Sequence, residues 1–130
     1  MNNKLTNCLF YIRISIALVL IMWTIDKFIN PAHGVGVFEK FYFIAGLETQ
    51  IMTIIGVLEM ALIALFLIGR FKNITYLAVL IIHAVSTITP YGVYLDPFAG
   101  AGLLFFAAWP MLAACYMLYV FREDDTKFNF

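Results

Sequence analysis

Four long apolar stretches constrain the fold of this chain more than any other feature of its sequence. They run over residues 8–25, 51–68, 74–89 and 102–121. A helix that crosses a bilayer needs about 20 mostly apolar residues, whereas a transmembrane strand alternates apolar and polar side chains. Because these stretches are continuous, the sequence predicts an all-α, integral membrane four-helix bundle that forms one transmembrane domain over residues 1–130.

The composition excludes most soluble classes of protein. Hydrophobic residues make up 64% of the 130 residues and charged residues 12%, against about 45–50% and about 25% in ordinary soluble domains. A small soluble domain buries too little of its surface to hide so many apolar side chains. The net charge is zero, so we expect the lipid bilayer, and no nucleic acid, as a partner. Cys8 and Cys115 lack CxxC spacing and are expected to be small buried side chains.

The positive charges predict which side of the membrane holds the termini. With four spans, the N-terminus, the short turn at residues 69–73 and the C-terminus share one side. That side carries Lys4, Arg13, Arg70, Lys72, Arg122 and Lys127, and the other side carries Lys27 and Lys40. Cytoplasmic loops are enriched in Lys and Arg, so this excess places both termini in the cytoplasm.

The longest connection, residues 26–50, is expected to be a loop with one unusual segment. Pro31 and three glycines interrupt it, and the aromatic, weakly charged residues 37–44 lie between the interruptions. Such a segment favours the membrane interface or a re-entrant path into the protein. His33 falls in this loop, where a histidine is normally solvated, and two histidines at different depths without ligand spacing predict no metal site.

Glu59 is the most informative polar residue, because it lies halfway along the second apolar stretch. Carboxylates inside a membrane usually face the interior of the bundle and have a partner. His83 is the partner that depth suggests. Glu59 and His83 each lie nine residues from the cytoplasmic end of their helix, about 13–14 Å at 1.5 Å of rise per residue. An antiparallel hairpin therefore brings them to the same level, although depth alone does not say that their faces meet.

Pro110 and Trp109 fall near this level on the fourth stretch. A proline inside a helix frees a carbonyl and can kink the chain. Either these two residues only shape the packing, or they line a small polar pocket together with Glu59 and His83.

A second polar group lies at the outer end of the first stretch, with Asp26 and Lys27 as its charges. Adjacent residues do not share a helix face, so each is expected to find a separate partner. Arg13, at the opposite end, is expected to extend its charge to the inner interface. The acidic tail at residues 122–125 is interpreted as a solvated helix end.

The chain resembles the DoxX-like membrane proteins in two stretches. The first comprises residues 13–18, Trp23 and the Asp-Lys-Phe-Ile-Asn-Pro segment at 26–31. The second runs from the Gly-Val-Leu-Glu-Met segment at 56–60 to residues 67–70. Four hydrophobic helices in about 130 residues also fit this family.

The resemblance implies a four-helix membrane bundle in the bacterial cytoplasmic (inner) membrane. Some members of the family are small subunits of a thiosulfate:quinone oxidoreductase, and others are membrane partners of soluble redox proteins in thiol and superoxide stress. The family's polar anchors correspond here to Asp26, Lys27, Asn30, Pro31 and Glu59. The chain has no cysteine pair for dithiol chemistry.

Three functions fit these observations. The first is a redox-associated membrane subunit that binds a quinone or similar lipid-soluble cofactor through Glu59, His83, Trp109, Asp26 and Lys27. An acid and an imidazole are suited to hydrogen-bond quinone oxygens, and another redox subunit would supply the electrons, since the sequence has no flavin, haem or iron–sulfur motif. The second is a non-catalytic scaffold of a larger complex, and the third is a small transporter or channel that acts as a homo-oligomer.

Overall fold

The computed structural model describes residues 3–41, 49–98 and 102–128, and every regular element in these ranges is a helix. The helices are α1 (Asn3–Ile29), α2 (Pro31–Phe41), α3 (Thr49–Leu67), α4 (Lys72–Ile88), α5 (Tyr91–Leu95), α6 (Gly102–Phe105) and α7 (Ala108–Val120). The stretches Asn3–Ile29, Gln50–Leu67 and Gly102–Val120 are long and apolar enough to cross a membrane. The prediction of helical structure is thus confirmed for the described residues, and three of the four predicted spans correspond to helices that could cross a membrane, while α4, with 17 residues, is shorter.

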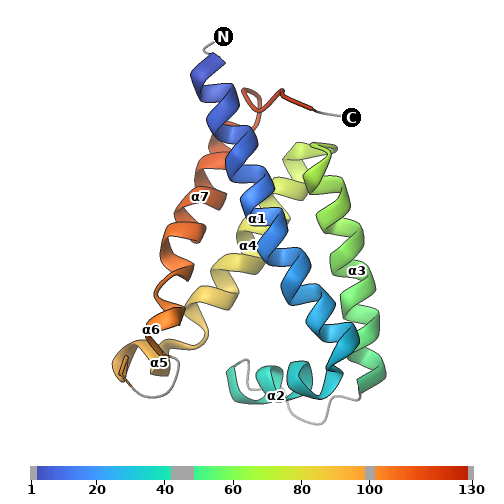
Figure 1. The fold of residues 1–130 in the computed structure, drawn as a ribbon, viewed down its shortest axis with the longest axis vertical. Coiled ribbons are helices and arrows are strands. Elements are labelled where there is room, and N and C mark those ends of the chain that lie inside the picture. Colours follow the sequence, from blue (N-terminus) through green and yellow to red (C-terminus); the bar gives the residue numbers. More distant parts are fainter. Residues whose placement is uncertain (1–2, 42–48, 99–101, 129–130) are drawn as a thin grey trace.

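The long helices pack around one core. α1 lies along α3, α4 lies against α7, and α3 and α4 form the antiparallel hairpin expected from the short turn between them (Figure 1). Buried side chains from all four helices meet in the core, among them Leu9 and Ile16 of α1, Phe66 of α3 and Leu118 of α7. The aromatic rings of Phe66 and Tyr76 lie 5.1 Å apart and join the two arms of the hairpin.

A Schellman motif ends α3 and makes the hairpin turn. The N–H of Arg70 donates to the carbonyl of Leu65 (2.9 Å), and the N–H of Gly69 donates to that of Phe66 (3.1 Å). Gly69 has φ 71°, the left-handed conformation that glycine adopts without strain. The turn brings the start of α4 to the end of the molecule that also holds the N-terminus and the residues after α7 (Figure 1), as expected for four successive spans.

The fourth predicted span is interrupted. α6 ends at Phe105 and α7 begins at Ala108. Pro110 has no N–H for the carbonyl of Phe106, four residues earlier, and that carbonyl instead accepts the N–H of Trp109 at 3.2 Å. The proline therefore breaks the helix one turn before its own position.

The prediction of a loop at residues 26–50 is wrong for most of the residues that the structure describes in this range, because they are helical. α1 continues to Ile29, and Pro31 starts α2, as proline often does at the first position of a helix. α2 lies across the ends of α1 and α3 (Figure 1), the direction expected of an interfacial segment. Residues 42–44 of the predicted interfacial segment lie outside the described residues. His33 belongs to α2 rather than to a loop.

The outer faces of the helices are apolar. Leu58 is 66% exposed, Ile81 52% and Leu104 75%, and many similar side chains surround them. A soluble monomer rarely exposes so much contiguous apolar surface. The helices therefore suggest an integral membrane protein whose outer side chains contact lipid.

Replacement by alanine is expected to have opposite effects on stability at two glycines, Gly102 and Gly92. A Cβ on Gly102 would lie 2.7 Å from the carbonyl oxygen of Pro97, a backbone atom, whereas a Cβ on Gly92 would have no atom within 4 Å. We expect Gly102→Ala to destabilise the bundle by about 1–3 kcal/mol through overpacking. Gly92→Ala should be neutral or stabilise by up to about 1 kcal/mol, because alanine favours the helix. Thermal unfolding in detergent measures both; a lower melting temperature for Gly92→Ala than for Gly102→Ala would contradict this interpretation.

Candidate functional site

A cavity of about 1210 Å³ lies between α1, α4 and α7, and α3 contributes one wall. Its lining residues on α1 recur every three or four positions, from Tyr11 and Ile12 to Trp23 and Lys27, so they form one face of the helix. Residues 11 to 27 of a helix span about 24 Å. The cavity is therefore long, and most of its walls are aliphatic or aromatic.

An ion pair lies at the α2 end of this cavity. Nζ of Lys27 on α1 lies 3.1 Å from Oε2 of Glu59 on α3, and the hydroxyl of Thr24 donates to the same oxygen at 3.2 Å. All three residues line the cavity. The side chains of Lys27 and Glu59 are 17% and 26% exposed, so the pair borders the open space rather than the packed core.

Gly56 allows α1 and α3 to approach closely beside this ion pair. A Cβ at Gly56 would lie 2.9 Å from the ring of Phe28, so a larger residue would push that ring away. Phe28 and Gly56 belong to the two stretches on which the family resemblance rests, and the Lys27–Glu59 pair joins the same two stretches.

Asp26 takes a different partner from Lys27, as adjacent helix positions require. Its Oδ2 lies 2.5 Å from Nδ1 of His33 on α2. The expectation of separate partners for Asp26 and Lys27 is thus confirmed. Asp26 and His33 also line the cavity, and so charged or ionisable groups concentrate at this end of it.

His83 of α4 lies on another part of the cavity wall and is almost completely buried, with 1% of its surface exposed. Its Nε2 is 3.0 Å from the carbonyl oxygen of Ala108 and 3.4 Å from the hydroxyl of Thr87. The indole of Trp23 stacks on the imidazole with ring centroids 6.0 Å apart. Nδ1 of His83 has no hydrogen-bond partner among the described residues.

The side chains of Glu59 and His83, which depth suggested as partners, form no hydrogen bond with each other but lie on the same cavity. Both side chains line one cavity, but Glu59 bonds to Lys27 and Thr24, and His83 bonds to Ala108 and Thr87. The hairpin sets the depth of the two residues, whereas the rotation of each helix decides which neighbour each side chain reaches.

Trp109 lies outside the cavity. Its ring packs on Tyr94 with centroids 5.6 Å apart and is 44% exposed, whereas Pro110, the next residue, does line the cavity. The phenol of Tyr94 donates to the carbonyl of Thr87 at 2.7 Å. Burial raises the pKa of Tyr94 above its ordinary value, so the phenol remains a neutral donor that connects α5 to α4.

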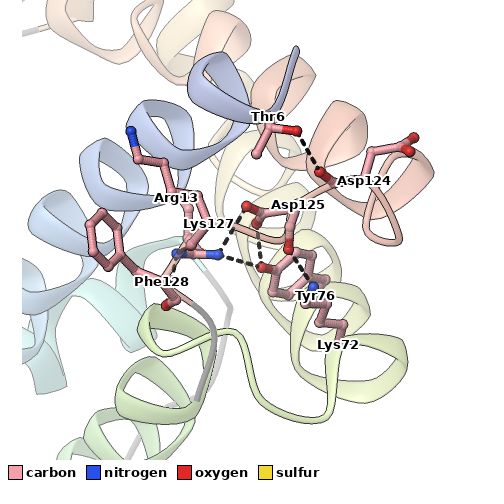
Figure 2. A network of polar contacts seen from close by, with 8 residues as sticks. All are labelled: Thr6, Arg13, Lys72, Tyr76, Asp124, Asp125, Lys127 and Phe128. Atoms are coloured by element: carbon pink, nitrogen blue, oxygen red, sulfur yellow. Dashed lines mark hydrogen bonds and ion pairs between the residues drawn. The ribbon is translucent and has the colours of Figure 1, made fainter. Parts of the chain in front are cut away.

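The expectation that Arg13 extends toward the aqueous interface is wrong. Arg13 is completely buried and its Nη1 lies 2.9 Å from Oδ1 of Asp125. Asp125, in the acidic tail interpreted as solvated, is also completely buried. Its other oxygen accepts the hydroxyl of Tyr76 at 2.5 Å. Figure 2 shows the tail folded over α1 and α4 to make these contacts.

Backbone atoms of the tail complete this network (Figure 2). The guanidinium of Arg13 donates to the carbonyls of Lys127 (2.5 Å) and Phe128 (3.3 Å), and the ammonium of Lys72 donates to that of Asp125. Sequence reasoning missed the network because Asp125 follows other acidic residues after a helix end, the usual pattern of a solvated terminus. The only signal was an arginine inside the first apolar stretch.

The expectation for the cysteines is correct for one of the two. Cys115 is buried in the core, whereas Cys8 is exposed on α1. Neither forms a disulfide. The position of a cysteine within an apolar stretch therefore does not determine whether its side chain is buried, because the outer face of α1 is apolar as well.

Fold and cavity together describe a small helical protein with three helices that could cross a membrane and a long, partly open cavity that has a charged end. No family model, curated protein or solved structure matches this chain.

Proposed function

We propose that this protein binds a quinone or a similar lipid-soluble molecule in the cavity between α1, α4 and α7, as a membrane subunit or partner of a redox system. The observation that carries the proposal is the composition of that cavity: long apolar walls with the Lys27–Glu59 pair at one end and His83 on the wall. Apolar pockets with a few convergent polar groups are typical of ligand sites.

The polar end has donors and an acceptor for a ligand headgroup. The ammonium of Lys27 has three N–H donors, and among the described residues its bond goes to Glu59. The single O–H of Thr24 is shared between the carbonyl of Leu20 at 2.7 Å and Oε2 of Glu59 at 3.2 Å. A quinone oxygen can therefore accept from Lys27 while the isoprenoid or alkyl tail lies along α1.

The redox role rests on the resemblance to the DoxX-like proteins, and the contact between the two stretches that carry it supports this role. Lys27 pairs with Glu59, and Phe28 packs at Gly56. Two of the polar residues on which the resemblance rests, Lys27 and Glu59, are thus neighbours in space. Electrons would come from a partner protein, because this chain carries no motif for an electron-transfer cofactor.

Retention of ligand during purification tests this function. Protein extracted in mild detergent should carry a quinone or related lipid that mass spectrometry identifies. Glu59→Gln should lower the retained amount about tenfold, because Glu59 is the partner that holds the ammonium of Lys27 beside the cavity. Glu39→Gln is the matched control, because Glu39 is an exposed carboxylate on α2 that does not line the cavity. Equal retention in wild type, Glu59→Gln and Glu39→Gln would reject the site.

A further inference from the structure

The hydrogen bonds of His83 determine which of its nitrogens carries the proton. Nε2 lies 3.0 Å from the carbonyl oxygen of Ala108, which only accepts hydrogen bonds. Nε2 must therefore be the N–H donor. The hydroxyl of Thr87 does not supply that proton, because it donates to the carbonyl of His83 itself at 2.7 Å. Nε2–H is consequently directed at Ala108, with Thr87 Oγ1 beside it at 3.4 Å.

Nδ1 is then a bare acceptor. A second proton there would bury an imidazolium with no carboxylate among its contacts, and such a charge is very costly without a partner. The hydrogen-bonding and ring contacts of His83 in the described residues are Ala108, Thr87 and the stacked ring of Trp23. Nδ1 is buried and unpartnered. A buried acceptor without a donor is costly, and a ligand that donates to it regains that free energy.

The position of His83 connects this acceptor to the cavity. His83 and Trp23 both line the cavity, and Trp23 is 47% exposed. Its indole covers one face of the imidazole, whereas the lone pair of Nδ1 lies in the plane of that ring. A donor on a molecule in the cavity would therefore approach Nδ1 along the ring plane, beside the stacked indole.

We infer that the cavity selects lipid-soluble molecules that carry a hydroxyl donor, through a hydrogen bond from the ligand O–H to Nδ1 of His83. This inference rests on the proposed function and defines its ligand class more closely. A quinone has carbonyl oxygens that only accept, so it leaves Nδ1 unpaired, whereas the corresponding hydroquinone donates. The site therefore favours the reduced form of the pair.

Three matched probes test the selection on the full-length protein. They are a decyl-substituted benzohydroquinone, the corresponding benzoquinone, and the dimethyl ether of the hydroquinone, which has the same ring and tail but no O–H. Calorimetric titration without oxygen, into protein in lipid nanodiscs, should give about tenfold tighter binding of the hydroquinone than of either other probe. His83→Phe should bind all three equally.

The outcomes separate the two proposals. Equal binding of the three probes to wild type overturns the selection and leaves ligand binding in the cavity intact. Binding of none overturns the proposed function as well. The wild-type comparison alone can overturn the selection, whereas loss of the preference in His83→Phe assigns it to Nδ1 of His83 rather than to the carboxylate of Glu59, which also lines the cavity. If His83→Phe does not fold, the spectroscopic measurement on Nδ1 makes this assignment.

A spectroscopic measurement checks the tautomer directly. The chain has two histidines, so ¹⁵N-histidine labelling of a His33→Asn variant leaves one imidazole. Its spectrum should show a protonated Nε2 and a bare Nδ1, and the hydroquinone should shift the Nδ1 signal. A protonated Nδ1 in the ligand-free protein would overturn the inference.

Discussion

Replacing Asp125 with alanine should destabilise the helical bundle by about 3–5 kcal/mol. The substitution leaves the guanidinium of Arg13 buried without its counter-ion, and removal of one partner of a buried pair typically costs that much. The hydroxyl of Tyr76 also loses its acceptor. Unfolding in mixed detergent and dodecyl sulfate micelles, followed by circular dichroism, measures the loss of free energy.

A neighbouring position supplies the control. Glu123 is exposed in the same tail, so Glu123→Ala should change the free energy of unfolding by less than about 0.5 kcal/mol. The double variant Arg13→Leu/Asp125→Leu should regain most of the loss, because no uncompensated charge remains. If Asp125→Ala and Glu123→Ala unfold at the same point, the tail does not stabilise the bundle in the way described here.

Replacing Lys27 with methionine should destabilise the other end of the bundle by about 2–3 kcal/mol. The carboxylate of Glu59 would then face the apolar cavity with Thr24 as its remaining partner, and an ionised carboxylate inside a membrane is costly by about that amount. The melting temperature in a neutral detergent is the measurement.

Neutralising both charges is the corresponding control. Lys27→Met/Glu59→Gln should be more stable than Lys27→Met alone, since the double variant has no buried charge. Arg13 and Lys27 are about 21 Å apart along α1, so the effects of Lys27→Met and Asp125→Ala should add. A double variant no more stable than Lys27→Met would show that the pair contributes nothing through its charges.

Much of the architecture could be predicted from the sequence, because long apolar stretches have few alternatives to helices in a membrane. Residues 51–68 and 74–89 agree with α3 and α4 to within a few positions. The interruption of the helix before α7 was harder to predict from the sequence. Pro110 indicated a kink, but only the chain geometry shows that the break falls at residues 106 and 107.

The charged contacts show where such prediction ends. Depth along a hairpin follows from residue counting, and it brought Glu59 and His83 to one cavity. The rotation of α1 against α3 does not follow from counting, so Lys27 was not identified as the partner of Glu59. Arg13 and Asp125 lie on opposite ends of the chain, and no local pattern in a single sequence records a contact over such a separation.

The contact between Arg13 and the tail also sets the order in which the bundle can be completed during synthesis. The carbonyl of Lys127 that binds Arg13 lies 114 residues later in the chain. Synthesis proceeds from the N-terminus at about 5–20 residues per second, so α1 enters the membrane several seconds before its arginine meets the tail. During that interval the nascent first helix carries an unneutralised cation, which can hold its N-terminal end near the lipid headgroups. Residues made well after the first helix are thus the ones that complete the bundle around it.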